Sequence, residues 1–316
     1  MSSFTVRPYR PADEQQVLHV WNAAMWADPI DASGFRRTVL LDPNCRPEGL
    51  QVAEAGADIA GFMLALHRRV PNFRDGLQAD QAWITAFGVL PNARRQGVGQ
   101  RLLDASLAYA ESDGARVVRI APYVPNYVIP GVDVAAYPEA VALLERNGFT
   151  VTSRPLSMRA ELTGFRIPEQ IAQTAERLAA EGIVIRPAVA TDIPQVLDFA
   201  ARLFSWDWWS NATEVLGALF AGGSSRGVGM WVAYNGGQLL GYSMHRAERF
   251  GPFGVDPALR SRGIGRVLLA ETLLGMRRQQ FHAARFLWTS DSAARLYAQC
   301  GFREVRRFAV MEKQLG

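Results

Sequence analysis

Lysine, cysteine and histidine are scarce in this chain of 316 residues. Of the 34 basic residues the only lysine is Lys313, near the C-terminus, which excludes a Gly-Lys-Ser/Thr phosphate loop and a pyridoxal Schiff base in a core. Two cysteines, Cys45 and Cys300, are too few for a disulfide framework, and we expect both to be reduced and buried. The four histidines are widely spaced in sequence, so we predict no metal site.

Long apolar runs are also missing. No segment approaches the roughly 20 apolar residues of a membrane helix, and residues 1–10 hold no apolar signal core, so we expect a cytoplasmic protein without membrane contact. Hydrophobic residues make up 49% and charged residues 20%, as in globular proteins, and the length predicts about two domains. The arginine excess is typical of a GC-rich genome. The net charge of +4 favours small anionic ligands, and no feature of the sequence indicates nucleic acid as a partner.

The chain contains two copies of one plan. Three pairs of segments correspond in the same order: 6–8 (Val-Arg-Pro) and 185–187 (Ile-Arg-Pro), 88–99 and 254–265, and 148–149 and 301–302 (both Gly-Phe). We therefore predict an N-terminal domain at 1–163 with an insertion at about 123–138, a connecting helix within 164–182, and a C-terminal domain at 183–316.

Each copy predicts the same series of elements. A strand and helices are followed by a hairpin (51–66 or 230–244), a strand ending at a glycine-rich turn, a long helix (about 97–112 in the first copy), a strand, a helix and a closing hairpin. The predicted fold class is α/β, with a mixed central sheet flanked by helices in each copy.

The glycine-rich turn indicates phosphate binding. In the first copy, glycines at 97 and 99 open a helix whose first backbone N–H groups are unpaired and carry positive partial charge. Glycine at 97 also lets a pyrophosphate approach the backbone without meeting a Cβ atom. The second copy repeats the arrangement at Gly263 and Gly265.

The spacing argues against a dinucleotide fold, because leucine (Leu102 and Leu268) stands where the third glycine belongs. The pattern that fits is Arg-x-x-Gly-x-Gly after a strand ending in Val-x-Pro. Together with the later segment 297–302 (Tyr-Ala-Gln-Cys-Gly-Phe), it resembles the GNAT acetyltransferase superfamily, over nearly the whole chain and twice. The resemblance implies two tandem GNAT-like domains that transfer an acetyl group from acetyl-CoA to a primary amine of an unidentified small molecule or peptide by direct attack.

The resemblance also implies cofactor-binding residues. The backbones of Phe87 and Val89, and of Phe253 and Val255 in the second copy, would pair with the pantetheine arm of coenzyme A. The pyrophosphate would be held by the two glycine-rich turns: Arg94, Arg95, Gln96, Gly97, Val98, Gly99 and Gln100, and Arg260, Ser261, Arg262, Gly263, Ile264, Gly265 and Arg266.

For catalysis the resemblance points to the second copy. Tyr297 stands where the family places the acid that protonates the departing thiolate, and a phenol with a pKa of about 10 suits a thiol of about 8.5. It could instead only pack beside the next aromatic residue. Glu248 is the candidate base, with His245 as a fallback, although a solvated hairpin glutamate fits the same position. The first copy has Leu144 in place of the tyrosine, so a non-catalytic coenzyme A-binding regulatory or scaffold protein is the alternative function.

Two further regions are candidate parts of an acceptor site. The insertion carries Asp133 and three tyrosines, Tyr123, Tyr127 and Tyr137; it looks like a loop of some bacterial GNAT proteins and could replace the missing acid or form a structural lid. Aromatic and acidic residues also gather in the early helices of both copies. Such groups suit a cationic amine, and equally a half-buried helix. They are Trp21, Trp26, Asp28 and Asp31 in the first copy and residues 204–209 in the second.

Overall fold

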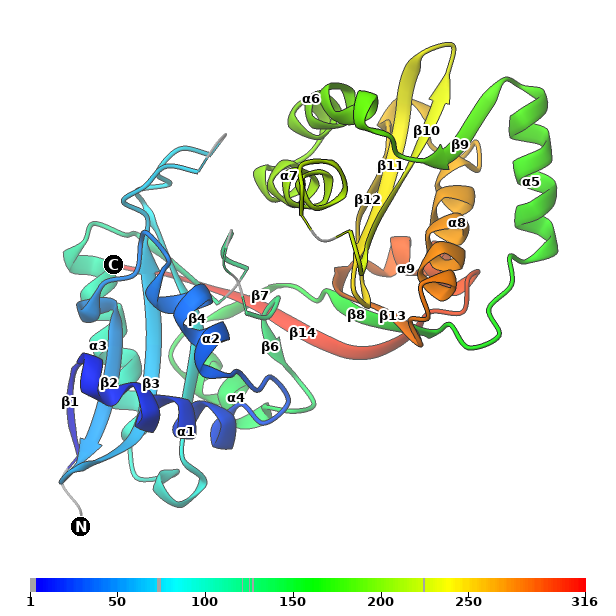
Figure 1. Ribbon diagram of the computed structural model, residues 1–316. Helices are drawn as coiled ribbons and strands as arrows, with labels where there is room; N and C mark the ends of the chain where they lie inside the picture. Colours follow the sequence, from blue (N-terminus) through cyan, green and yellow to red (C-terminus); the bar gives the residue numbers. More distant parts are fainter. Residues whose placement is uncertain (1–3, 73–74, 121, 125, 127, 224) are drawn as a thin grey trace. The chain divides into compact units, whose positions relative to one another are not determined.

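The structure is a computed structural model that describes residues 4–72, 75–120, 122–124, 126, 128–223 and 225–316. Contacts divide the chain into two compact units (Figure 1). Unit 1 comprises Met1–Pro155 and Arg307–Gly316, and unit 2 comprises Leu156–Arg306. Each holds a mixed sheet with helices packed on it, which confirms the predicted fold class. Within the described ranges, no helix has the length and apolar character needed to cross a membrane.

The sheet of unit 1 has the strand order β1-β2-β3-β4-β5-β14. Neighbouring strands are antiparallel except β4 and β5, which are parallel. The strands are β1 (Thr5–Pro8), β2 (Leu50–Ala55), β3 (Asp58–His67), β4 (Gln81–Val89), β5 (Val117–Ile120), β6 (Val132–Asp133), β7 (Thr150–Ser153) and β14 (Arg303–Gln314). The helices are α1 (Glu14–Ala24), α2 (Ala32–Phe35), α3 (Val98–Ser112) and α4 (Pro138–Arg146).

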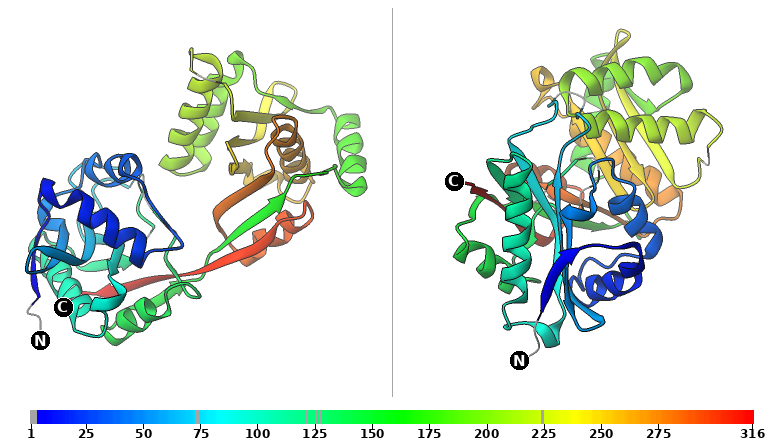
Figure 2. Two further views of the ribbon diagram at one scale, coloured as in Figure 1. Left: turned by 60° about the horizontal axis from the view of Figure 1, so that its bottom comes forward. Right: turned by 90° about the vertical axis from the view of Figure 1, so that its left-hand side faces the viewer.

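Helices cover both faces of the unit 1 sheet. The strand β3 is buried along nearly its whole length, as expected for an apolar strand with helices on both sides. Leu102, Leu103 and Ala110 of α3 are buried on one face, and Val17 and Trp21 of α1 are buried on the other. The right-hand view of Figure 2 shows α1 and α3 on opposite sides of the strands. The apolar residues of the predicted long helix therefore form its core face.

Unit 2 repeats this arrangement. Its sheet contains β8-β13-β12-β11-β10-β9, with α6 and α7 packed on one face and α5 and α8 on the other. The strands are β8 (Leu156–Glu161), β9 (Ile183–Pro187), β10 (Val228–Asn235), β11 (Gln238–Arg246), β12 (Arg249–Val255) and β13 (Ala283–Thr289). The helices are α5 (Glu169–Ala180), α6 (Ile193–Leu203), α7 (Trp206–Phe220), α8 (Ile264–Arg278) and α9 (Asp291–Ala298).

The first repeated motif is a structural ion pair. Arg7 Nη1 lies 2.7 Å from Asp13 Oδ2, and the same carboxylate accepts the N–H of Arg10 at 2.7 Å. Arg186 and Asp192 make the same pair at 2.7 Å in unit 2. The arginine holds the pKa of each aspartate below its usual range. Each pair thus fixes the turn between the first strand and the first helix.

The predicted closing hairpins are wrong. The strands β7 and β8 do not pair with each other: Ser153 of β7 pairs with Val310 of β14, and Arg159 of β8 pairs with Arg285 of β13. The strand β14 begins in unit 2 and its last residues pair with β5 in unit 1. An alternating apolar pattern predicts a strand but not its partner, so this exchange could not be found from sequence.

The sequence repeats and the compact units divide the chain differently. The repeat boundary near residue 163 follows the order of the motifs, whereas the unit boundaries after Pro155 and Arg306 follow contacts. The final strand of each repeat lies in the unit that contains most of the other repeat.

Candidate functional site

The strand β4 extends past its parallel neighbour β5. The two strands pair from Gln81 and Val117 to Ile84 and Ile120, where β5 ends. The rest of β4 continues along β3 alone, after a register shift that leaves Thr85 unpaired between Ile84 and Ala86. One side of β4 is therefore open from Thr85 to Val89 within the described part of the chain.

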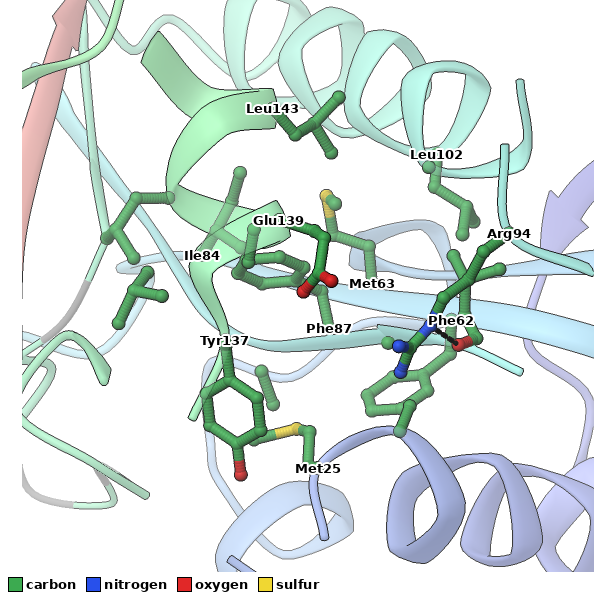
Figure 3. A pocket seen from close by; sticks show the side chains of 18 of the residues that line it. Met25, Phe62, Met63, Ile84, Phe87, Arg94, Leu102, Tyr137, Glu139 and Leu143 are labelled. Atoms are coloured by element: carbon green, nitrogen blue, oxygen red, sulfur yellow. Dashed lines mark hydrogen bonds between the residues drawn. The ribbon is translucent and has the colours of Figure 1, made fainter. Parts of the chain in front are cut away.

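Backbone groups of Phe87 and Val89 face this open side. Leu90 N donates to Ala60 O across β3 at 2.8 Å, and residues bonded to the neighbouring strand alternate in an antiparallel ladder. Gly88 therefore faces β3, while Phe87 and Val89 point away from it. The carbonyl of Val89 accepts a hydrogen bond from Arg94 Nε at 3.2 Å (Figure 3).

The glycine-rich turn of unit 1 has a left-handed backbone at its key position. Gly97 is the N-cap of α3 with φ of 81°, a conformation that favours glycine. A Cβ atom at Gly97 would meet nothing within 4 Å, so glycine is needed there for the backbone angle, and the space beside it is open. The first N–H groups of α3 carry positive partial charge toward that space.

A cavity of about 540 Å³ joins these features. Its walls are the free end of β4, the start of α3, one face of α4 and the segment after α1 (Figure 3). Most of the lining is apolar, including Met25, Phe62, Met63, Ile84 and Leu143. Seven of the nine expected cofactor residues of this copy line it: Phe87, Val89, Arg94, Arg95, Gly97, Gly99 and Gln100.

The cavity has a basic end and an acidic end. Arg94 and Arg95 lie at the start of α3, and Arg146 lies at the last turn of α4. Glu139 is in the first turn of α4, about 10 Å along the helix from Arg146, and its carboxylate points into the cavity (Figure 3). The charge pattern suits a ligand with phosphates at one end and a cationic group at the other.

Tyr137 and the segment after α1 form the wall beside Glu139. The Tyr137 hydroxyl donates to Asp28 Oδ2 at 2.8 Å and accepts the Ala27 N–H at 3.1 Å. The ring of Trp26 meets the Tyr137 ring edge-on with 6.4 Å between centroids, and Trp26 is 63% exposed. This wall thus offers aromatic surface next to a carboxylate.

The insertion holds Tyr137 in place. Asp133 is buried, and its carboxylate accepts the N–H groups of Ala135 and Ala136 at 2.9 and 3.0 Å. Its carbonyl accepts the N–H of Tyr137 at 2.9 Å. Tyr123 is fully buried and donates to Asp42 Oδ1 at 3.0 Å, so it belongs to the core, and Pro125 and Tyr127 lie outside the described residues.

The glycine-rich turn of unit 2 has the same backbone and different surroundings. Gly263 caps α8 with φ of 96°, but a Cβ atom there would lie 2.6 Å from Thr174 of α5. Arg177 of α5 donates to the carbonyl of Arg262 at 2.6 Å, and the Arg262 side chain pairs with Glu181 at 2.6 Å. The connecting helix is therefore bound to this turn.

Aromatic rings surround Tyr297. Its ring centroid lies 4.5 Å from that of Phe286, 5.7 Å from Phe302 and 6.0 Å from Phe253. Burial raises the pKa of Tyr297, and a hydrogen bond with Thr289 offsets part of the rise. Phe253, which was expected to pair with pantetheine, and the candidate acid thus pack together within unit 2.

The candidate bases of unit 2 lie at the far end of its β11–β12 hairpin. Glu248 is half-buried in the turn, and its carbonyl accepts the N–H of Arg285 at 2.8 Å. His245 is fully buried, with Nδ1 3.2 Å from the carbonyl oxygen of Ala247, and burial lowers its pKa to about 4. The imidazole is neutral at physiological pH.

Two family models match the sequence in the two halves of the chain. An acetyltransferase (GNAT) family model matches residues 16–149, and an acetyltransferase (GNAT) domain model matches residues 226–304. The chain belongs to the GNAT acetyltransferase superfamily. The sequence-based prediction of two GNAT domains is confirmed. No curated protein matches the sequence.

Solved structures share this tandem GNAT fold. A GCN5-related glucosamine N-acetyltransferase region of a fungal multi-domain beta-N-acetylglucosaminidase matches with a TM-score of 0.78 and 17% identity over 99% of this chain and 38% of that one. A GCN5-related N-acetyltransferase from Sphaerobacter thermophilus matches with a TM-score of 0.68 and 18% identity, over 98% of this chain and 95% of that one. A tandem GNAT protein from the clavulanic acid biosynthesis pathway matches with a TM-score of 0.65 and 16% identity, over 99% of each chain. At these identities the likeness shows the fold.

Several expected contacts of the GNAT acceptor region are packing contacts. Trp21 is fully buried and stacks on Phe62 at 5.2 Å, so it forms part of the core. Asp31 caps α2 through the N–H of Gly34 at 2.6 Å. In unit 2, Phe204 and Trp208 stack at 4.0 Å. Of the aromatic residues predicted in this region of unit 1, Trp26 lines the cavity.

Sequence comparison of the two GNAT copies did not find Glu139, whereas Tyr137 was one of the three tyrosines predicted in the insertion. At the position of Tyr297 the first copy has the fully buried Leu144, and this difference predicted catalysis in the second copy. The sequence signal for Glu139 was its place in the first turn of a helix that begins with Pro138. That pattern is common at the start of helices, so it does not by itself indicate a functional residue.

Proposed function

We propose that the protein is an acetyl-CoA-dependent N-acetyltransferase that acts on a primary amine of a small molecule or peptide, and that it binds acetyl-CoA in the cleft of unit 1. One observation carries the proposal. A single cavity of about 540 Å³ joins the open edge of β4, the glycine-rich turn before α3 and the carboxylate of Glu139.

The residues of unit 1 suit the cofactor that GNAT proteins typically use. The backbones of Phe87 and Val89 offer hydrogen bonds to the pantetheine amides, and the open space beside Gly97 admits a pyrophosphate next to the N–H groups of α3. Arg94 and Arg95 add positive charge. Bound acetyl-CoA would supply an acetyl group activated as a thioester.

Glu139 is the proposed general base. A primary amine is protonated at neutral pH and becomes nucleophilic only after it loses a proton. The carboxylate of Glu139 would attract the ammonium group and accept that proton, while the rings of Trp26 and Tyr137 would face the cation. Direct attack of the amine on the thioester, without a covalent enzyme intermediate, requires this base and no nucleophilic side chain.

The alternative location for the active site, with the same acetyltransferase function, is unit 2. There Tyr297 would be the acid, Glu248 the base, and Phe253, Val255 and the turn from Arg260 to Arg266 the cofactor site. The contacts of α5 with that turn and the packing of Phe253 against Tyr297 favour unit 1 instead.

A second candidate function is a coenzyme A-binding regulatory or scaffold protein. Its specific support is Leu144, an apolar and fully buried residue at the position where the family pattern expects an acid. In this case the cleft would bind the cofactor without turnover.

Release of coenzyme A from acetyl-CoA in the presence of a broad panel of amines distinguishes the acetyltransferase function from the scaffold function. We expect turnover with at least one amine and a fall in kcat of about 10²-fold or more in Glu139→Gln, the usual scale for a lost general base. Glu145→Gln is the matched control, because Glu145 is an exposed residue of the same helix outside the cavity lining. Cofactor binding without turnover of any amine would favour the scaffold function.

A further inference from the structure

A second cavity of unit 1, about 150 Å³ in volume, lies at the opposite end of β4. It shares no lining residue with the larger cavity. Its polar lining comes from five segments of the chain: Arg68 after β3, Gln78 and Gln81 before and at the start of β4, Arg119 of β5, Thr152 of β7 and Glu312 of β14.

Arg68 brings a buried positive charge to this cavity. The residue is 5% exposed, and its guanidinium lies 5.0 Å from the ring of Trp83 and 4.8 Å from the ring of Tyr123. Its Nε donates to Gln78 Oε1 at 3.0 Å and its Nη2 to the carbonyl of Val124 at 2.7 Å. Burial lowers its pKa, because little water reaches the charged group.

The carboxylates around Arg68 do not neutralise it. Asp42 and Asp75 act on it only at a distance, since neither comes within 4.0 Å of its guanidinium in the described part of the chain. Asp42 already accepts hydrogen bonds from Tyr123 and Asn126. A buried arginine is normally paired with an anion. Arg68 can therefore bind an anionic ligand.

Two more polar atoms at the cavity have no hydrogen-bond partner among the described residues. They are the buried Nε of Arg119 and the buried Oε1 of Gln81. Glu312 Oε2 lies 3.8 Å from Arg119 Nε, which is too far for a hydrogen bond. Unpaired buried groups are rare in native proteins, and these two need an acceptor and a donor respectively.

The backbone conformation of Gln78 is a further sign that this cavity is a binding site. This residue has φ of 49°, in the left-handed region that a residue other than glycine seldom adopts. The side-chain oxygen of the same residue accepts the hydrogen bond from Arg68 Nε. Strained backbone of this kind tends to occur at binding sites.

We propose that this cavity binds a small α-amino acid. The ligand's carboxylate would accept from Arg68 and Arg119, and its ammonium group would donate to Gln81 Oε1 and the Glu312 carboxylate. A cavity of about 150 Å³ is larger than one water requires and limits the ligand to a few heavy atoms, so glycine and alanine are the best-fitting probes.

The site would also bind the C-terminal strand to unit 1. Glu312 belongs to β14 and Arg119 to β5, and the two residues are paired across the antiparallel ladder. A ligand that contacts both residues is bound by the folded protein only, and it therefore raises the thermal midpoint.

Calorimetric titration and thermal unfolding of the full-length protein with glycine and alanine test the proposal. We expect one site per chain, a rise in the thermal midpoint, and binding at least about tenfold weaker for acetate or methylamine, each of which carries one of the two charges. Arg119→Met and Gln81→Met should each weaken glycine or alanine binding about tenfold. The matched control Arg159→Met should not, because Arg159 is also a strand arginine, 43% exposed and paired with a carboxylate.

Several results would overturn the proposal. No heat and no stabilisation with either amino acid at millimolar concentration would mean that the cavity holds only water. Binding of acetate or inorganic phosphate as tight as that of glycine would mean an anion site without an ammonium subsite. Glu139→Gln should bind glycine normally, so failure of the acetyltransferase proposal would leave this test unaffected.

Discussion

The hydroxyl of Tyr137 donates to the carboxylate of Asp28 at 2.8 Å, which connects the start of α4 to the segment after α1 in unit 1. The same hydroxyl accepts the N–H of Ala27. These bonds hold the wall of the cavity that carries Trp26 and Glu139. The hydrogen bond therefore positions the proposed amine-binding side of the cleft, and Tyr137 acts on that side through its neighbours.

Removing this hydroxyl should loosen the wall. We expect Tyr137→Phe to lower the free energy of unfolding by about 1–2 kcal/mol, because a hydrogen bond to a carboxylate and one from a backbone N–H are lost. The KM for the amine should rise more than kcat falls. Denaturant unfolding and steady-state kinetics measure both effects.

Tyr242→Phe is the control for Tyr137→Phe. The Tyr242 hydroxyl is buried without a hydrogen-bond partner in the described structure, so its removal should leave stability unchanged or raise it. Equal losses of stability in the two variants would contradict a specific role for the Tyr137 hydroxyl.

Tyr297→Phe tests which unit carries the chemistry. If catalysis takes place in unit 1, this substitution removes one hydrogen bond in unit 2 and leaves kcat/KM for amine acetylation within about threefold of the wild-type value. Loss of turnover by a factor of about 100 or more would move the active site to unit 2.

Stability should depend on pH through His245. Burial lowers its pKa to about 4 from an ordinary 6.5, so the unfolded chain takes up a proton at a higher pH than the folded protein. The stabilising contribution is complete above about pH 6.5 and is lost as the pH falls toward 4, by up to about 3 kcal/mol. Urea unfolding at pH 7.5 and 5.0 should show a larger loss for the wild type than for His245→Gln; equal losses would contradict it.

The exchanged strand should contribute to the stability of unit 1. Met311 of β14 is fully buried and pairs with Ile120 of β5, so Met311→Ala should cost about 2–5 kcal/mol. Hydrogen exchange at Val118 and Ile120 should become faster in this variant. Val305→Ala, at an exposed position of the same strand, should leave these amides protected. Unchanged protection in Met311→Ala would argue against the exchange.

The residues that recur in both copies allowed much of this structure to be predicted. The glycine-rich turns and the long helices depend on local backbone geometry and short-range contacts, and sequence patterns record such features directly. The partner of β14 could not be predicted, because its short apolar run at 308–311 indicates a buried strand but not the sheet to which the strand belongs. Glu139 was missed for another reason: a glutamate in the first turn of a helix is common, and only the tertiary structure shows that this one faces a cavity.

The most direct test of the central claim is calorimetric titration of acetyl-CoA into the wild-type protein and into Gly97→Glu, Gly97→Ala and Gly263→Glu. Gly97→Ala and Gly97→Glu share the strain of a left-handed residue, but only the second places a negative charge beside the phosphate site. We predict one binding site per chain, lost in Gly97→Glu and retained in Gly97→Ala and in folded Gly263→Glu. Binding that survives Gly97→Glu and disappears in Gly263→Glu, or no binding to the wild type, would contradict an acetyl-CoA site in unit 1.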